Sequence, residues 1–510
     1  MVVVGALVLV TAGSLIWRTG GLDVGYWIDE AIAVGIASHD LADIPRTLSQ
    51  DGSPPLYYLL LHGWMQLVGA GEAATRTLSL GFALAAVPVA WWSGRVVFDR
   101  RVAALAAAGA AGCPFLTYYA QETRMYSLVA VLSLVAAASF ARAFLHGRRG
   151  HVVLLGVWLV LLLYTHTWGV FLVAAMALAW LVLWRTERVG GRDGAWLGAA
   201  IAVAYAPWMP TLAYQAAHTG APWAARPLAV ELLGAPGALF GYAAAPLLAL
   251  AVITAVRRRD GRVAPRGGAR DERVVVLAAI AVAAAGGAWL VSQFGPAWSA
   301  RYLAVLFGPL LLALAAVVAR GTRWTAVALA GVAALWLASG PPPAKSNVRA
   351  LAATVAPVVR QGDLVVSTQP EQVPVLYRYV PAGVVYVTPL GVVPDPRLTD
   401  WRDALPQLRA GHADRRLLPL LEHVAPGTRI LLVTPSGFRR SSPWSRAVRT
   451  RTREWRSALR TDPRVRALAG PTRPPPPGVR SGARAELFEV VSRTGTADRR
   501  ASASSRTVRG

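Results

Sequence analysis

Long apolar runs separated by short polar loops dominate residues 1–340 of the chain. A helix needs about 20 apolar residues to cross a bilayer, and about eleven runs approach that length. We therefore expect a polytopic α-helical membrane protein with about eleven transmembrane helices. The runs cover Val2–Trp17, Thr77–Val97, Val102–Ala120, Tyr126–Leu145, Val152–Leu163, Trp168–Trp184, Ala195–Trp208, Leu232–Val256, Val274–Val291, Leu303–Val318 and Trp324–Ser339.

The composition agrees with this pattern. The chain is 55% hydrophobic and 15% charged, which is too apolar for a single water-soluble domain. Much of its formal net charge of +25 lies in short loops between the apolar runs, so membrane topology explains the charge better than nucleic-acid binding does. We expect contact with membrane lipid and no nucleic-acid partner.

Basic clusters predict the orientation, because cytoplasmic loops are enriched in Lys and Arg. With the N-terminus inside, eleven spans place all of the clusters in the cytoplasm. The loops between them then face outward, including the long segment after the first span. The clusters are Arg95–Arg101, Arg142–Arg149, Arg185–Arg192, Arg257–Arg273 and Arg320–Arg323.

The first outer segment, residues 18–75, contains a helix of a different kind. Leu56–Val68 follows two prolines and mixes aromatic with aliphatic residues. It is short for a crossing, and aromatic side chains favour the membrane–water interface. We predict an interfacial helix, because a crossing here would invert every later loop and put the basic clusters outside.

Past Pro341–Pro343 the pattern becomes that of a small soluble α/β domain. Asp363–Ser367 and Arg429–Val433 predict short buried strands, and Val373–Tyr379 and Trp401–His423 predict helices. After eleven spans this domain is extracytoplasmic.

These patterns give three predicted regions. Residues 1–340 form the membrane domain and residues 341–493 the α/β domain. Residues 494–510 have the Ser, Arg and Gly composition of a disordered tail.

Two adjacent carboxylates, Asp29 and Glu30, follow the first apolar run. An ionised carboxylate near a bilayer is costly unless a metal, an arginine or a substrate offsets it. Adjacent acids can divide labour, one accepting a proton while the other orients a group or binds a metal. Adjacent helical residues point roughly 100° apart, so we expect only one to face a reaction centre, and spacing does not say which. An ordinary solvated loop is the alternative.

Other polar residues are predicted on the same outer face. Glu122 and Arg124 join two apolar runs, where Arg124 could hold an anion or merely pair with Glu122 on an exposed turn. Arg301, beside Tyr302, is an outward arginine against the charge bias and hence a candidate for a phosphate. Snorkelling to the interface is the alternative for Arg301.

A metal receives little support from the sequence. His166 lies between two apolar runs at the outer face, where a lone histidine is more often a satisfied interface residue than a ligand. Dense His or Cys spacing does not occur, so a structural metal is unsupported. A catalytic divalent metal stays possible, with Glu122 and His166 as candidate ligands.

Several motifs together resemble the polytopic glycosyltransferases of the C superfamily, in the branch of the protein O-mannosyltransferases and the lipid A aminoarabinose transferase. The resemblance covers about residues 1–340, and the first 130 carry most of its specificity. The motifs are Trp27-Ile28-Asp29-Glu30, Asp51-Gly52-Ser53-Pro54-Pro55-Leu56-Tyr57-Tyr58, Glu72–Arg76, Gln121–Tyr126, Pro207–Pro210 and Arg301–Leu303.

The resemblance implies an inverting glycosyltransferase at the outer face of the cell membrane. It would move mannose or a similar sugar from a polyprenyl-phosphate donor to a hydroxyl of a lipid, glycan or protein acceptor. Carried over, Asp29 is the general base, and Glu30, Asp51 and Glu122 are supporting acids for the acceptor or a metal. Arg124 and Arg301 lie near the donor phosphate, with His166 and Tyr302 as further substrate-binding candidates.

Two other functions are compatible with parts of the pattern. A transporter or flippase of lipid-linked saccharide would need charged residues in the middle of spans, whereas these runs are nearly free of charge. A scaffold would use the outer α/β domain to bind envelope polymer, and a domain deletion that leaves transfer intact would argue against it.

Overall fold

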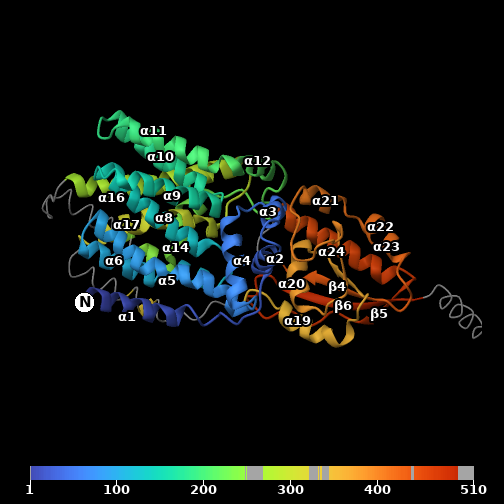
Figure 1. Cartoon of the computed structure of the whole chain (residues 1–510). Helices are drawn as coiled ribbons and strands as arrows, with labels where there is room; N and C mark the ends of the chain where they lie inside the picture. Colours follow the sequence, from blue (N-terminus) through green and yellow to red (C-terminus); the bar gives the residue numbers. More distant parts are fainter. Residues whose placement is uncertain are drawn as a thin grey trace, which may run out of the picture. The chain divides into compact units, whose positions relative to one another are not determined.

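The computed structural model describes residues 2–246, 248–249, 268–320, 331, 334–335, 344–437 and 442–491. The chain divides into two compact units, a helical one and one built around a sheet (Figure 1). The first unit comprises Met1–Asp23, Asp40–Ala216 and Arg226–Pro342. The second comprises Val24–His39, Ala217–Ala225 and Pro343–Gly510.

The first unit is entirely helical in its described part. Its principal helices are α1 (Val2–Trp17), α3 (Ile44–Asp51), α4 (Leu56–Val68), α5 (Glu72–Val97), α6 (Arg100–Ala111), α7 (Pro114–Ala120), α8 (Tyr126–Phe140), α9 (Gly150–Thr165), α10 (Gly169–Arg185), α11 (Gly191–Tyr205), α13 (Ala229–Leu233), α14 (Ala235–Phe240), α16 (Gly268–Phe294), the 3-10 helix η4 (Ala300–Leu306) and α17 (Phe307–Val318). Helix α12 (Met209–His218) follows α11, and its last two residues are assigned to the second unit.

Five helical segments of the described chain are long and apolar enough to cross a membrane, or six if the bent pair α6 and α7 forms one span. They are Glu72–Val97, Tyr126–Leu145, Gly191–His218, Gly268–Phe294 and Ala300–Val318. Shorter apolar helices cover Val3–Trp17, Gly150–Thr165 and Gly169–Arg185, where the sequence also predicts spans. A polytopic helical architecture is thus confirmed, and the number eleven stays a prediction.

Some of the predicted features cannot be compared with the structure. The predicted spans Leu232–Val256 and Trp324–Ser339 lie partly outside the described residues, as does the loop Arg257–Arg273, and the predicted tail at 494–510 lies wholly outside them. Helix α4 has the bounds expected of the interfacial helix. Its place in the interface plane stays a prediction.

Close packing around α8 forms the centre of the first unit, where small residues let helix backbones approach. Helix α8 is buried on nearly all sides. A Cβ on Gly308 of α17 would lie 2.3 Å from the carbonyl oxygen of Ser133 of α8. The Ser133 hydroxyl accepts a hydrogen bond from the Gly308 amide at 3.0 Å. A larger residue at position 308 would force these two helices apart.

The second unit contains a six-stranded sheet in the order β3-β2-β1-β4-β6-β5. Strand β1 pairs in parallel with β2 and with β4, and the remaining pairs are antiparallel. Apolar side chains of β1 and β4 and Trp455 of α24 form its core. The strands are β1 (Leu364–Ser367), β2 (Val385–Thr388), β3 (Gly391–Val392), β4 (Arg429–Pro435), β5 (Val465–Ala469) and β6 (Ala483–Val490).

The principal helices of this unit are α2 (Ile28–Ala37), α19 (Val348–Val355), α20 (Val373–Tyr379), α21 (Ala404–Ala410), α22 (Ala413–Arg416), α23 (Leu418–Leu421) and α24 (Pro443–Thr461). The strands expected near residues 363–367 and 429–433 and the helix at 373–379 are present. The single helix expected over Trp401–His423 is instead three short ones, α21 to α23. Gly411 and Pro419 interrupt it, since glycine weakens a helix and proline removes a backbone donor.

Helix α2 belongs to the second unit, although the sequence boundaries put it in the membrane domain. The backbone amide of Tyr26 donates to the Tyr379 hydroxyl at 2.7 Å. His39 Nε2 lies 2.7 Å from Asp395 Oδ2. These contacts join segments more than 350 residues apart, which is why local sequence patterns do not indicate them.

Candidate functional site

Asp29 and Glu30 occupy the first turn of α2, where the helix dipole favours negative charge. They differ in burial, as expected for neighbours on a helix. Glu30 is 1% exposed, whereas Asp29 is half-buried. Asp29 is therefore the more accessible carboxylate of the pair.

Six of the predicted site residues belong to the first unit, and contacts and electrostatic interactions link them into one group. Asp51 Oδ2 accepts a hydrogen bond from the Tyr58 hydroxyl at 3.3 Å. The same hydroxyl accepts one from Arg124 Nη1 at 3.3 Å. The Arg124 guanidinium also lies 5.8 Å from the ring centre of Tyr126. Tyr58 thus connects an acid from the end of α3 to an arginine from the turn before α8.

Aromatic contacts extend this group from Tyr126 to Arg301. The His166 ring lies 5.9 Å from that of Tyr126 and 4.8 Å from that of Tyr302. The guanidinium of Arg301 lies 5.4 Å from the Tyr302 ring. We call this group the two-arginine cluster, and its members are Asp51, Tyr58, Glu122, Arg124, Tyr126, His166, Arg301 and Tyr302.

The charges of Glu122, Arg124 and Arg301 act on shared neighbouring residues, which places all three within one cluster. Glu122 and Arg301 both act on the hydroxyl of Tyr119. Arg124 and Arg301 both act on His166. Two guanidiniums in a poorly hydrated setting attract an anion more strongly than they would in water.

Burial excludes the exposed-turn alternative for Glu122 and Arg124. Glu122 is fully buried and Arg124 is 8% exposed. Arg301 is half-buried and packs beside Tyr302. The sequence pattern assigned no role to Tyr58 or Tyr126, although both lie within the motifs that carry the family resemblance. The available clue was that each tyrosine closely follows a polar turn, Asp51–Pro55 for Tyr58 and Gln121–Arg124 for Tyr126.

Neither predicted metal ligand belongs to the three-ligand group found among the described residues. In the part of the chain that the structure describes, the group able to supply three ligand atoms is His412, Asp414 and Glu454, and it contains neither Glu122 nor His166. Arg451 Nη1 lies 2.7 Å from Glu454 Oε2 there, so a guanidinium already offsets that carboxylate. A divalent metal at Glu122 or His166 stays a prediction.

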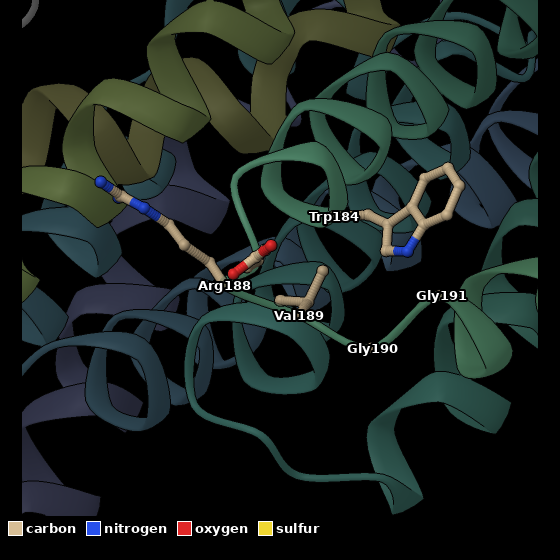
Figure 2. Close-up of a pocket in the computed structure, with 6 residues that line it drawn as sticks. Trp184, Arg188, Val189, Gly190 and Gly191 are labelled. Carbon is tan, nitrogen blue, oxygen red and sulfur yellow. The ribbon is translucent and has the colours of Figure 1, made fainter.

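A surface hollow lies away from these residues, at the turn between α10 and α11 (Figure 2). Trp184, Glu187 and Val189 are among its lining residues. Figure 2 shows Arg188 and Trp184 on opposite sides of the turn, and Arg188 Nη1 lies 2.5 Å from Glu272 Oε1. None of the predicted site residues lines it, so we assign it no role in the chemistry.

Comparison with known proteins bears on the helical unit and on the whole fold. Residues 52–214 match a family model described as Dolichyl-phosphate-mannose-protein mannosyltransferase. That segment begins beside Asp51 and includes Tyr58, Glu122, Arg124, Tyr126 and His166 of the two-arginine cluster. No curated protein matches the chain in sequence.

Two solved structures share the fold at low sequence identity. One is ArnT from Cupriavidus metallidurans in the apo state, with 14% identity and a TM-score of 0.50 over 96% of this chain and 98% of that one. The other is the apo oligosaccharyltransferase of Archaeoglobus fulgidus, with 12% identity and a TM-score of 0.50 over 85% of this chain and 69% of that one. The ArnT match extends over both the helical unit and the sheet-containing unit.

Proposed function

We propose that this chain, which resembles the polytopic membrane glycosyltransferases of the C superfamily in its family-model match and in its fold, transfers mannose or a similar sugar from a polyprenyl-phosphate donor to an acceptor hydroxyl. The gathering of Arg124 and Arg301 in the two-arginine cluster supports the proposal most directly. A lipid phosphate needs cations at the membrane surface. The family match favours this enzymatic role over a transporter or a scaffold.

In the proposed reaction the two arginines hold the donor phosphate. A guanidinium offers parallel N–H donors that match two phosphate oxygens. Asp51 and Glu122 would balance the arginines and orient them, and His166 and Tyr302 would line the donor beside Arg301. No step depends on a metal.

Asp29 is the proposed general base. It accepts the proton of the acceptor hydroxyl as that oxygen attacks the anomeric carbon from the face opposite the phosphate. The bond to the phosphate oxygen breaks, and the configuration inverts. The leaving phosphate needs little help from an acid. Buried Glu30 would support Asp29 without touching the acceptor.

A transfer assay with a panel of polyprenyl-phosphate-linked sugars tests this function directly. Purified protein is incubated with polyprenyl-phosphate-linked mannose, other hexoses and pentoses, together with glycan, lipid and peptide acceptors. We expect a product whose mass increases by one sugar residue with a single preferred donor. An enzyme that leaves every donor intact would refute the proposal.

Replacing Arg301 is expected to weaken donor binding. A charge-assisted hydrogen bond is worth about 1.5–3 kcal/mol, so Arg301→Ala should lower donor affinity by about 10–100-fold. Arg301→Lys keeps the charge but loses the paired donors and should fall between Ala and wild type. Equilibrium binding of the polyprenyl-phosphate sugar measures both.

Arg226 provides the matched control, because it is an exposed arginine of the same unit. Arg226→Ala should bind donor like the wild type, and Arg124→Ala should resemble Arg301→Ala. Unchanged affinity in both Arg301→Ala and Arg124→Ala would mean that other groups hold the phosphate.

The orientation is proposed from the basic clusters. We place Gly147 in the cytoplasm, and Asp51 and the sheet-containing unit outside the cell membrane. Single cysteines at positions 147 and 51, introduced after replacing Cys113 by Ser, test this. An impermeant thiol reagent applied to intact cells should modify position 51 and spare position 147. The reverse labelling would invert the topology.

A further inference from the structure

The sheet of the second unit has a point where the chain changes direction. From β1 the chain passes through α20 to β2 on one side, and then through α21 to α23 to β4 on the other side of β1. All three strands are parallel. In open parallel sheets, ligands bind beyond the carboxyl ends of the strands at such a switch point. The loop Thr368–Gln372 follows β1 at this position.

This loop is polar and yet buried. Glu371 is 7% exposed and Gln372 is 2% exposed. Glu371 Oε1 accepts hydrogen bonds from Gln369 Nε2 at 2.8 Å and from Trp444 Nε1 at 2.9 Å. The loop is also fixed to its neighbours, because Thr368 Oγ1 lies 2.8 Å from Thr452 Oγ1 of α24. The side chains of Thr368 and Glu371 are therefore held in place.

Three buried polar atoms of the loop have no hydrogen-bond partner among the described residues. They are Oε2 of Glu371 and both Oε1 and Nε2 of Gln372. Folded proteins satisfy the large majority of their buried polar side-chain atoms. Leaving three buried polar atoms without partners lowers the stability of the fold, and a loop with a purely structural role would gain nothing from it. Their position at a switch point therefore indicates a binding site.

The loop lies close to the helix that carries the proposed base. Helix α20 follows the loop directly and packs against α2. Burial raises the pKa of Glu371, the hydrogen bonds from Gln369 and Trp444 oppose the rise, and the charge of Asp29 adds to it. Asp29 thus acts electrostatically on Glu371.

We infer that Glu371 and Gln372 form a subsite for a hydroxyl-rich glycan acceptor beside Asp29. This inference rests on the proposed function and names its acceptor class. The unpartnered atoms include both acceptors and a donor, and neighbouring sugar hydroxyls can donate and accept at once. An ionised carboxylate repels phosphate and offers no phosphate-binding cation, so the loop suits the neutral acceptor and not the donor.

The test uses three variants of the full-length protein. Glu371→Gln keeps the size of the side chain and replaces its carboxyl group by a neutral amide. Gln372→Met keeps the size of the side chain while removing both unpartnered atoms. Glu422→Gln is the control, because it makes the same change at an exposed carboxylate that pairs with Arg464 in the same unit. Binding of a panel of neutral mannose, galactose and arabinose oligosaccharides is measured by calorimetry, together with donor affinity, acceptor KM and melting temperature.

We expect one oligosaccharide class to bind the wild type and the control equally. Glu371→Gln and Gln372→Met should each weaken that binding, and raise the acceptor KM, by about tenfold. Donor affinity should stay unchanged. Gln372→Met should melt at the wild-type temperature or above it, because it removes unsatisfied polar atoms. A structural role would lower the melting temperature instead.

Two results would overturn the subsite. One is that no oligosaccharide binds the wild type, and the other is that both variants bind as the wild type does. Failure of the proposed function differs from both: the wild type would transfer no sugar from any donor, whereas the oligosaccharide would still bind and the two variants would still weaken it.

Discussion

Asp29→Asn is expected to lower the rate of sugar transfer by about 10²-fold or more, because it keeps the size of the side chain and removes its basicity. Asp29 is the accessible member of the acid pair, while Glu30 is buried. The proposed base acts on the acceptor, so affinity for the polyprenyl-phosphate donor should persist. Transfer rate at saturating donor, measured with donor affinity, separates these two effects.

Asp40 supplies the control for this substitution. It is an exposed aspartate just beyond the end of α2. Asp40→Asn removes a charge of the same kind from the same region and should leave transfer near the wild-type rate. If Asp29→Asn turns over normally, Asp29 is not the base, and Glu30 becomes the next residue to replace.

The sequence predicted the helical unit well, because the signals there are local. The apolar run at 126–145 coincides with a span-length helical segment, and α4 has the expected bounds. Long apolar runs need no distant partner to be identified. The predicted cluster residues also gather, and most of them lie at or just beyond a helix end: Asp51 ends α3, Glu122 and Arg124 follow α7, and His166 follows α9.

The sheet-containing unit was predicted only in part. Strand β6 was missed because charged residues interrupt its apolar alternation. One of them, Glu486, is nevertheless 2% exposed, and Arg456 Nε and Arg460 Nη2 each lie 2.6 Å from one of its carboxylate oxygens. The local sequence pattern does not distinguish a buried acid that pairs with arginines of another helix from an acid that is exposed to solvent.

The same reasoning applies to the polar loop after β1. The loop Thr368–Gln372 directly follows a predicted buried strand, which places it at a carboxyl end. The missing information was the strand order, because only β4 on the far side of β1 makes this edge a switch point. Burial of the loop could not be foreseen from four polar residues and a proline.

The packing of α2 within the second unit allows a test of whether Asp29 must occupy a fixed position for catalysis. Gly35 of α2 faces the backbone of Arg397, and a Cβ at this position would lie 1.7 Å from the Arg397 carbonyl oxygen. The segment Asp395–Arg397 is held by its own contacts and cannot easily move away from such a Cβ. Asp395 Oδ1 accepts from the Arg397 amide at 3.0 Å, and Asp395 Oδ2 lies 2.7 Å from His39 Nε2.

The charge of Asp395 persists at any pH near neutrality. Burial alone would raise the pKa of Asp395, but hydrogen bonds from Arg397 and His39 outweigh burial and lower this pKa to about 2. The carboxylate therefore keeps the Arg397 loop in place under assay conditions. An added methyl group at position 35 must displace α2 instead.

Gly35→Ala is accordingly expected to reduce transfer by about 10²-fold or more, because a misplacement of about 1 Å at a reacting group costs that much. In an unhindered helix the same change stabilises by up to about 1 kcal/mol. Gly63→Ala in α4 is the matched control, since nothing lies within 4 Å of its Cβ. Transfer rate and melting temperature are measured for both variants, with donor affinity as a third readout. Gly35→Ala should lose transfer while retaining the donor, and Gly63→Ala should retain both. Wild-type transfer in Gly35→Ala would mean that Asp29 needs no fixed position, and the assignment of a general base on α2 would then fail with it.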